Sequence, residues 1–131
     1  MTPQEIDLVA RTWRSVLPIR DTFAALFYAK LFELDPALKP LFRGDLREQG
    51  RSFVAMISIA LRNLDRPEKV LQALRELGRR HARYGVTPRH YETMQTALVL
   101  SLALSLGEAF TEEARAAWER AYSFLVDAML A

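Results

Sequence analysis

Cysteine is absent from the sequence, which excludes disulfide bonds, thiolate zinc sites, cysteine-ligated iron–sulfur clusters and cysteine nucleophiles. Long apolar runs are absent as well: the longest nearly apolar stretch, residues 97–106, is interrupted by Ser101 and Ser105. That stretch is too short to cross a bilayer, so the sequence predicts no membrane insertion. The first residues show no basic segment followed by an apolar one, so no signal peptide is predicted and a cytoplasmic location is expected.

A large excess of either charge is also missing. Lys and Arg number 18 and Asp and Glu number 16, which gives a net charge of +2. Proteins that bind nucleic acid usually present a strong positive field, so we expect no nucleic-acid partner. The two histidines, His81 and His90, lie on either side of Gly85 and Pro88. They cannot share a helix face, as the ligands of a zinc site would.

The chain is long enough for a single domain, residues 1–131, with a core of its own. No segment alternates apolar and polar residues over the length of a strand, whereas apolar residues recur at helical spacings of three and four. Capping residues, prolines and glycines divide this pattern into segments. The expected segments are residues 2–18, 21–34, 35–42, 46–64, 67–81, 87–106 and 111–129. The sequence therefore predicts an all-α domain of six or seven helices.

His81 stands at the end of segment 67–81, four residues after Leu77 and just before a stop at Gly85. A histidine in this position can direct Nε2 into a pocket while Nδ1 donates to a backbone carbonyl one turn back, expected to be that of Leu77. Such a hydrogen bond fixes the tautomer and makes the ring a better iron ligand, which is how a protein holds haem by one axial imidazole. The other interpretation is a structural or surface histidine.

Several motifs, in order along the chain, resemble those of the globin family. They are Trp13, Leu26-Phe27-Tyr28, Asp35-Pro36 through Leu41-Phe42, Gln49-Gly50, Leu77-Gly78-Arg79-Arg80-His81, His90-Tyr91, and Glu112-Glu113 with Ala117-Trp118. The chain resembles bacterial single-domain globins related to the haem domain of flavohaemoglobins, particularly the Hell's Gate globin type. The resemblance implies a globin fold, the 3-over-3 helical sandwich with a short or absent D helix, and haem b as the cofactor.

The resemblance implies that His81 is the proximal iron ligand, that Tyr91 ties down its ring and that Phe42 packs on the haem face. Large apolar side chains suit both faces of a flat macrocycle. The other expected haem contacts are Phe53, Leu77, Val86, Met94 and, toward a propionate, Arg51. The alternative for the apolar residues is ordinary core packing. His90 is expected to be a capping or surface residue, with a propionate contact as the alternative.

On the ligand side, the resemblance places Tyr28 and Gln49 over the iron, where a phenol and an amide can donate to bound dioxygen. The alternatives are a core tyrosine bonded elsewhere and a surface glutamine. Phe53 stands where the family usually carries leucine or valine, so we expect a smaller or reshaped oxygen pocket.

These features predict a haem b protein that binds dioxygen, carbon monoxide and nitric oxide. The alternative is a nitric oxide dioxygenase, which would need a separate reductase because the sequence shows no reductase region and no glycine-rich dinucleotide motif. A haem-free sensor or interaction module is the third interpretation, and it leaves the set of site residues unexplained. Five arginines cluster around His81 in the sequence: Arg75, Arg79, Arg80, Arg83 and Arg89. They could form a solvated helix face, contact haem propionates or contact an acidic redox partner.

Overall fold

The computed structural model describes residues 1–131 and contains α-helices and short 3-10 turns but no strand. The helices are α1 (Pro3–Val16), α2 (Arg20–Leu34), α3 (Leu46–Arg62), α4 (Leu71–Arg83), α5 (Pro88–Leu106) and α6 (Glu112–Leu130). The 3-10 turns are Leu17–Ile19, Pro36–Leu41, Pro67–Lys69 and Gly107–Ala109. The prediction of an all-α fold is confirmed. None of these helices is both long and apolar enough to span a membrane.

Local capping chemistry sets several helix boundaries. Before α1, the Thr2 hydroxyl accepts the Glu5 backbone N–H at 3.1 Å, and the Glu5 carboxylate accepts the Thr2 N–H at 2.8 Å. Asp45 and Thr111 each accept a backbone N–H from the first turn of the helix that follows, at 2.8 and 3.1 Å. These contacts satisfy N–H groups that have no partner inside the helix, so α1, α3 and α6 begin where the sequence predicts.

One predicted boundary is wrong. Residues 67–81 do not form one helix, because Pro67 begins a separate 3-10 turn and α4 begins only at Leu71. The Val70 backbone N–H closes this turn on the Pro67 carbonyl at 3.0 Å. A proline suits the first position of either kind of helix, so the residue type alone does not distinguish them.

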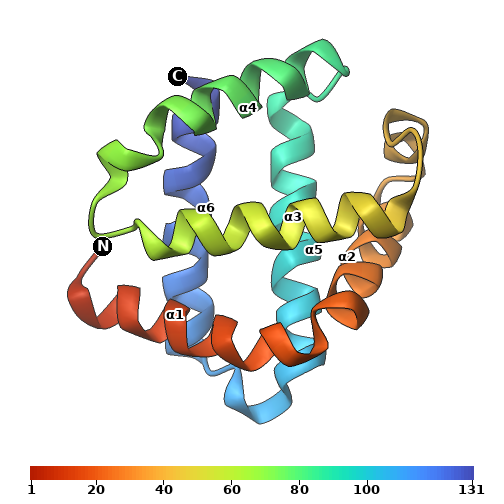
Figure 1. Ribbon diagram of the computed structural model, residues 1–131. Helices are drawn as coiled ribbons and strands as arrows, with labels where there is room; N and C mark the ends of the chain where they lie inside the picture. The colour runs from red at the N-terminus through yellow and green to blue at the C-terminus, as the bar shows by residue number, and fades with distance from the viewer.

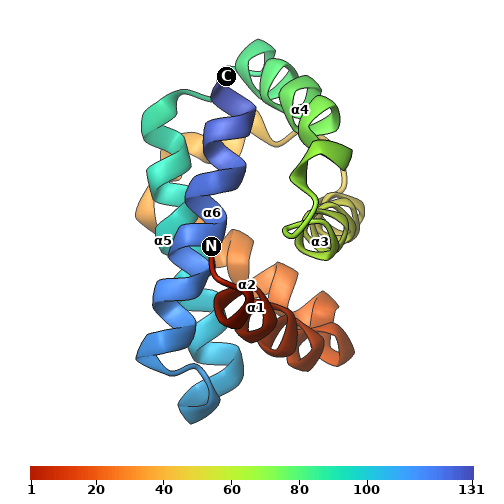
Figure 2. The ribbon, with the colours of Figure 1, turned by 90° about the vertical axis from the view of Figure 1, so that its left-hand side faces the viewer.

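The helices form two layers that cross each other. Helices α1, α3 and α4 run across α5 and α6, which lie behind them (Figure 1). The view in Figure 2 shows α5 and α6 on one side, with α3 and α4 on the other. Helix α2 packs against both α3 and α5 and so joins the layers. In the first layer α3 packs on α1 and α2, and α4 packs on α6, whereas α3 and α4 share at most a marginal contact.

The main hydrophobic core lies where α1, α2, α3, α5 and α6 meet, and no residue of α4 belongs to it. At its centre the Trp118 indole N–H donates to Thr12 Oγ1 at 2.6 Å, and the Trp13 indole N–H donates to Ser58 Oγ at 2.9 Å. Helix α4 is held by a separate small cluster of three buried residues, which are Val70, Leu74 and Ala128. The helix that carries His81 is therefore attached outside the main core, through its packing on α6.

Candidate functional site

The half-buried His81 ring lies in the last turn of α4. Its Nδ1 atom is 3.0 Å from the hydroxyl oxygen of Tyr91, near the start of α5. The prediction that Nδ1 donates to the Leu77 carbonyl is therefore wrong. The ring turns toward α5 instead, where the Tyr91 hydroxyl lies within hydrogen-bond distance of Nδ1. The hydrogen bond that orients His81 joins two helices rather than staying within one.

The surroundings of His81 favour a neutral imidazole. Burial lowers the pKa of His81, and the positive charge of neighbouring Arg80 lowers it further. A neutral imidazole carries one ring proton. When Nδ1 holds this proton and donates it to Tyr91, Nε2 presents a lone pair, and no protein group hydrogen-bonds to Nε2. His81 can thus offer one nitrogen to a metal while the other holds the ring in place.

Tyr91 is itself held by a second tyrosine. Only 3% of Tyr91 is exposed, and its backbone carbonyl accepts the hydroxyl of Tyr122, from α6, at 2.7 Å. Burial raises the pKa of both tyrosines, and Tyr91 raises that of Tyr122 further, so both phenols stay protonated. The sequence places Tyr122 only among the core positions of the last helix, because the partner of its hydroxyl depends on how α5 and α6 pack.

An aromatic group joins α2, α3 and the connection between them. The ring of Phe53 stacks on Phe27, with 4.4 Å between their centroids, and lies 6.2 Å from the ring of Tyr28. Phe42 meets Tyr28 edge-on at 5.4 Å. The structure therefore brings together three of the residues that the sequence assigned to the site, Tyr28, Phe42 and Phe53.

The hydroxyl of Tyr28 is a donor without an acceptor. Only 4% of this residue is exposed, and burial raises the pKa of Tyr28 well above its ordinary value, so the phenol keeps its proton. Every fully enclosed side-chain nitrogen or oxygen in the structure has a hydrogen-bond partner. The Tyr28 hydroxyl has none, so it is not fully enclosed by the core. It is available to donate to a ligand.

Helix α3 crosses α2 beside Tyr28, and the contact point is Gly50. A Cβ atom on Gly50 would lie 2.9 Å from Ala24 Cβ and 3.7 Å from Tyr28 Cε2, so the absent side chain permits the close approach. Gln49 and Arg51 flank this glycine, and both are exposed. The contact of Gln49 with a ligand and that of Arg51 with a propionate therefore stay predictions.

Gly78 lets α4 approach the end of α6. A Cβ atom on Gly78 would lie 1.9 Å from the Met129 carbonyl oxygen, a distance that no side chain can occupy. Gly78 is one turn before His81 on the same helix, so this contact also sets the position of the imidazole. This role could not be predicted from the sequence, because it depends on a backbone atom near the other end of the chain.

Three of the predicted apolar contacts, Phe42, Phe53 and Met94, pack at the edge of the main core. All of the predicted apolar contacts are half-buried: Phe42, Phe53, Leu77, Val86 and Met94. The turn before Val86 reaches the Phe42 segment, because a Cβ on Gly85 would lie 3.5 Å from Leu41 Cδ2. Half-buried apolar side chains together with an unpaired imidazole nitrogen and an unpaired phenol fit a flat apolar group held by one axial nitrogen. The residues present therefore fit haem.

The second histidine has a structural role. The Thr87 backbone N–H donates to Nδ1 of His90 at 3.0 Å, at the beginning of α5. This contact satisfies one of the N–H groups that a helix start leaves without a partner. His90 is therefore a capping residue, as expected.

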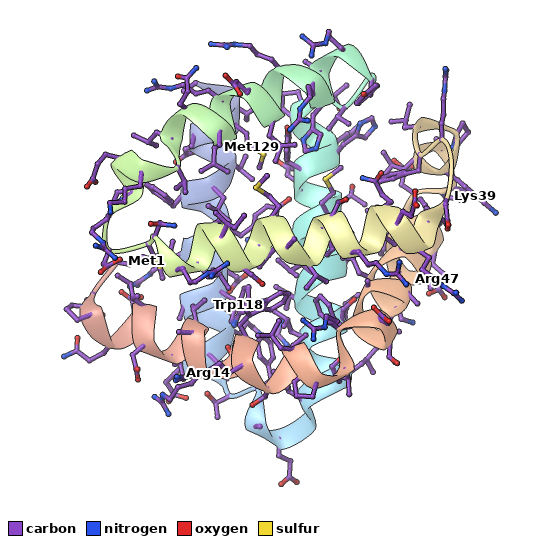
Figure 3. The ribbon with its side chains drawn as sticks, viewed as in Figure 1. Met1, Arg14, Lys39, Arg47, Trp118 and Met129 are labelled. Carbon is purple, nitrogen blue, oxygen red and sulfur yellow. The ribbon has the colours of Figure 1, made fainter.

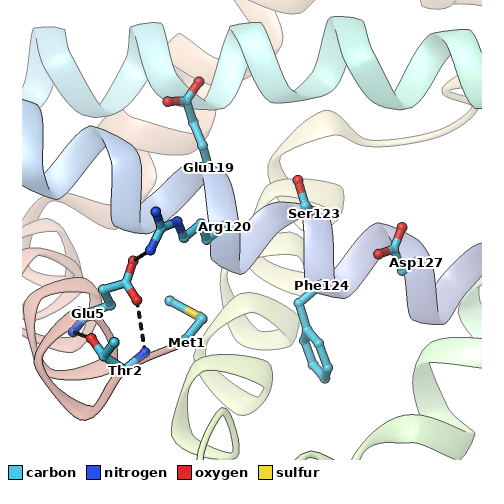
Figure 4. Close-up of a pocket in the computed structure, with 8 residues that line it drawn as sticks. All are labelled: Met1, Thr2, Glu5, Glu119, Arg120, Ser123, Phe124 and Asp127. Atoms are coloured by element: carbon cyan, nitrogen blue, oxygen red, sulfur yellow. Dashed lines mark hydrogen bonds and ion pairs between the residues drawn. The ribbon is translucent and has the colours of Figure 1, made fainter.

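A separate open pocket of about 770 Å³ lies between the start of α1 and α6 (Figure 4). Met1 and Phe124 are its only apolar lining residues, and an ion pair between Glu5 and Arg120 stands at its wall. A polar, open lining does not suit an apolar macrocycle. We therefore assign the candidate site to the residues around His81 and Tyr28.

Comparison with known proteins places the chain in a family. The Globin family model matches residues 25–129. The flavohemoprotein of Xylella fastidiosa (strain Temecula1) is 30% identical over 129 residues, which are 96% of this chain and 32% of that protein. The anaerobic nitrite reductase NSHB5 of Oryza sativa subsp. indica is 32% identical over 130 residues, covering 94% of this chain and 89% of that one. The chain belongs to the globin family.

A solved structure gives the same result. The engineered carbene transferase from Rhodothermus marinus, a putative nitric oxide dioxygenase, superposes with a TM-score of 0.88 at 26% identity, over 98% of this chain and 90% of that chain. The fold is therefore the globin fold, and the chain is related to the haem domain of flavohaemoglobins. It spans about a third of the length of the flavohemoproteins it matches.

Proposed function

We propose that this globin holds haem b through His81 and binds dioxygen and other diatomic gases reversibly. The observation that carries the proposal is the pair of unpaired groups in a chain of this family: Nε2 of His81 and the hydroxyl of Tyr28. Membership of the globin family implies haem as the cofactor. The absence of cysteine supports type b over type c, because c-type haem is attached through cysteine side chains.

When bound, haem supplies an iron atom at which dioxygen, carbon monoxide or nitric oxide is held reversibly. His81 would hold the iron through Nε2, while its Nδ1–H donates to Tyr91 and keeps the ring from rotating. Phe42, Phe53, Leu77, Val86 and Met94 would cover the faces of the macrocycle, and Arg51 would approach a propionate. Tyr28 donates a hydrogen bond to a polar gas ligand, and Gln49 is the second donor.

The Tyr28 hydroxyl provides the test of this function. Tyr28→Phe keeps the ring and removes only the donor, so dioxygen release should accelerate by roughly tenfold or more, the loss of about one hydrogen bond. Release of carbon monoxide should change much less, because carbon monoxide is a poor hydrogen-bond acceptor. Gln49→Leu should act in the same direction, and less than additively if both donors meet the same oxygen atom. Stopped-flow measurement of both release rates, on the single and double variants, gives the answer.

The matched control for Tyr28→Phe is Tyr84→Phe, which removes an exposed hydroxyl from the turn after α4. This variant should release both gases at the wild-type rates. Unchanged dioxygen release in Tyr28→Phe, Gln49→Leu and the double variant would mean that both residues are structural and that the proposed ligand pocket is wrong.

A nitric oxide dioxygenase is the second candidate, favoured by the similarity to flavohemoproteins and to a putative nitric oxide dioxygenase. The same donor, Tyr28, would stabilise the polar dioxygen ligand before nitric oxide reacts with it. Sustained activity would require electrons from a separate reductase. We expect nitrate to form beyond one equivalent only when both dioxygen and an electron donor are supplied, and nitrate analysis after addition of nitric oxide to the protein in aerated buffer, with and without the donor, measures this.

Tyr91 is expected to secure haem retention through His81. Tyr91→Phe removes the acceptor for Nδ1–H and leaves the ring in place, so haem affinity should fall by about tenfold to a hundredfold, as for other partners of metal-ligating histidines. The rate of haem transfer to an excess of apomyoglobin measures this effect. Tyr84→Phe again serves as the control and should leave the rate unchanged. An unchanged transfer rate in Tyr91→Phe would show that the 3.0 Å contact does not support the ligand.

A further inference from the structure

We propose that the outer surface of α4 is the docking site for an acidic electron-donor protein, a proposal that rests on the haem-binding function above. We call this surface the α4 face. Its residues are Arg75, Arg79, Arg80, Arg83 and Tyr84, and all five are exposed.

The α4 face concentrates positive charge in a chain that is otherwise slightly acidic. Residues 71–90 contain five arginines and one carboxylate, a net charge of +4, and the whole chain carries +2, so the remaining residues carry −2. Side chains tipped with nitrogen project from the outer side of α4 in Figure 3, well away from the labelled Arg14 and Lys39. The field of the protein is therefore directional, and it points outward from the helix that carries His81.

The arginines of this face are not engaged within the protein. None of them belongs to an ion pair, although five ion pairs occur elsewhere in the structure. The single carboxylate among them, Glu76, accepts a hydrogen bond from Gln72 at 3.3 Å. Three of the guanidinium side chains, with Glu76, line a pocket of about 330 Å³: Arg79, Arg80 and Arg83. Three of the four residues that line the pocket are thus arginines with no ion-pair partner in the chain.

Helix stability accounts for only part of this arrangement, since Glu76 has a favourable four-residue spacing to Arg80. Arg75, Arg79 and Arg83 follow each other at intervals of four residues, and like charges at that spacing destabilise a helix. Only the arginines of the last turn gain from the negative end of the helix dipole, and Arg75 lies too far from that end. A helix that retains repulsive pairs on one exposed face is consistent with recognition of an anion.

The exposed tyrosine points to a protein rather than to a small anion. Tyr84 is 64% exposed at the end of α4, and its hydroxyl has no hydrogen-bond partner. Tyrosine and arginine are the residues that most often dominate the binding energy of protein interfaces. Arg80 directly precedes His81, so a partner seated on the α4 face contacts the helix that carries the residue that would hold the iron. That position suits an electron donor.

Electron-transfer kinetics of the haem-loaded ferric protein test the proposal. The probe is a reduced plant-type [2Fe–2S] ferredoxin, an acidic protein, and the reference is photoreduced lumiflavin, a neutral molecule. The surface variant is Arg75→Gln/Arg79→Gln/Arg83→Gln. The control is Arg14→Gln/Arg20→Gln/Lys39→Gln, which removes the same charge from exposed residues elsewhere. At low ionic strength the rate constant with ferredoxin should fall at least tenfold in the surface variant and less than twofold in the control. The rate with lumiflavin should not change.

Three results would overturn the proposal. Equal losses in the two variants would show that only net charge matters, and no loss in either would show that the face is not used. Parallel losses with ferredoxin and lumiflavin would show that the arginines act on haem itself, through its propionates.

Binding of fluorescein-labelled decaglutamate, followed by anisotropy, separates this proposal from the proposed function. It does not depend on haem. The wild-type protein and the control variant should bind the peptide about tenfold more tightly than the surface variant, and equal binding by all three would overturn the docking site. Failure of the wild-type protein to take up haem would overturn the proposed function and the electron-donor role, while the peptide still tests recognition of an acidic chain.

Discussion

Replacement of His81 should abolish stable haem retention. His90 is used as a helix cap and no third histidine exists, so no other imidazole can take the place of Nε2. His81→Ala leaves a space beside Tyr91 that free imidazole fits, so added imidazole should restore haem binding in this variant. His81→Leu fills that space, so imidazole should not restore it there. Absorption spectra of the reconstituted proteins, oxidised, reduced and with carbon monoxide, measure retention and coordination together.

The matched control is His90→Ala, which removes the other histidine and loses only a capping hydrogen bond. Its spectra should equal those of the wild-type protein, with a small loss of stability of about 1 kcal/mol. A normal proximal-histidine spectrum in His81→Ala or His81→Leu would refute the assignment of the ligand.

Adding a single methyl group at Gly78 should destabilise the protein strongly. At an exposed helix position, glycine to alanine stabilises by up to about 1 kcal/mol. At Gly78 the new Cβ would lie 1.9 Å from the Met129 carbonyl oxygen, so α4 must move away from α6. We expect Gly78→Ala to lower the free energy of unfolding by about 2–3 kcal/mol, the upper range for an overpacked site, and to weaken haem retention because His81 moves with the helix.

Urea denaturation of the haem-free and haem-loaded proteins measures this change. Gln72→Ala, at an exposed position on α4, is the control and should shift the stability by less than about 0.5 kcal/mol. Shortening the Met129 side chain should not rescue Gly78→Ala, because the clash is with backbone atoms. A Gly78→Ala protein as stable as the wild type would show that α4 and α6 adjust without cost.

Local chemistry explains which parts of the fold could be predicted from the sequence. Helix α5 begins at Pro88 and ends at Leu106, as the Thr87-Pro88 pair and Gly107 indicate. These signals act within a few residues of the boundary they set. The start of α4 was mispredicted because Pro67 fits a 3-10 turn as well as an α-helix, and the choice between them depends on how the segment packs.

In the site, too, local features could be predicted from the sequence and contacts between helices could not. The type of residue at His81 and its place at the end of a helix are visible in the sequence, but its Nδ1 partner is not. That partner depends on the crossing of α4 and α5, which helical spacing does not specify, so the Leu77 carbonyl was the wrong choice. The globin resemblance pointed to Tyr91 because it carries information about tertiary structure. Tyr122 had no such signal, and Gly78 belonged to a motif that did not specify its role, since a core position and a helical glycine each have many ordinary explanations.

The attachment of α4 outside the main core has a dynamic consequence. This helix contributes nothing to the main core and is held by its packing on α6, a glycine contact and the His81–Tyr91 hydrogen bond. We expect a segment outside the main core to open by local unfolding at a lower free energy than the whole domain, so that its amide protons exchange first and its backbone is the first substrate for a protease. Any group that bridges α3 and α4 closes that route. Occupancy of the site would then set the lifetime of the protein as well as its chemistry.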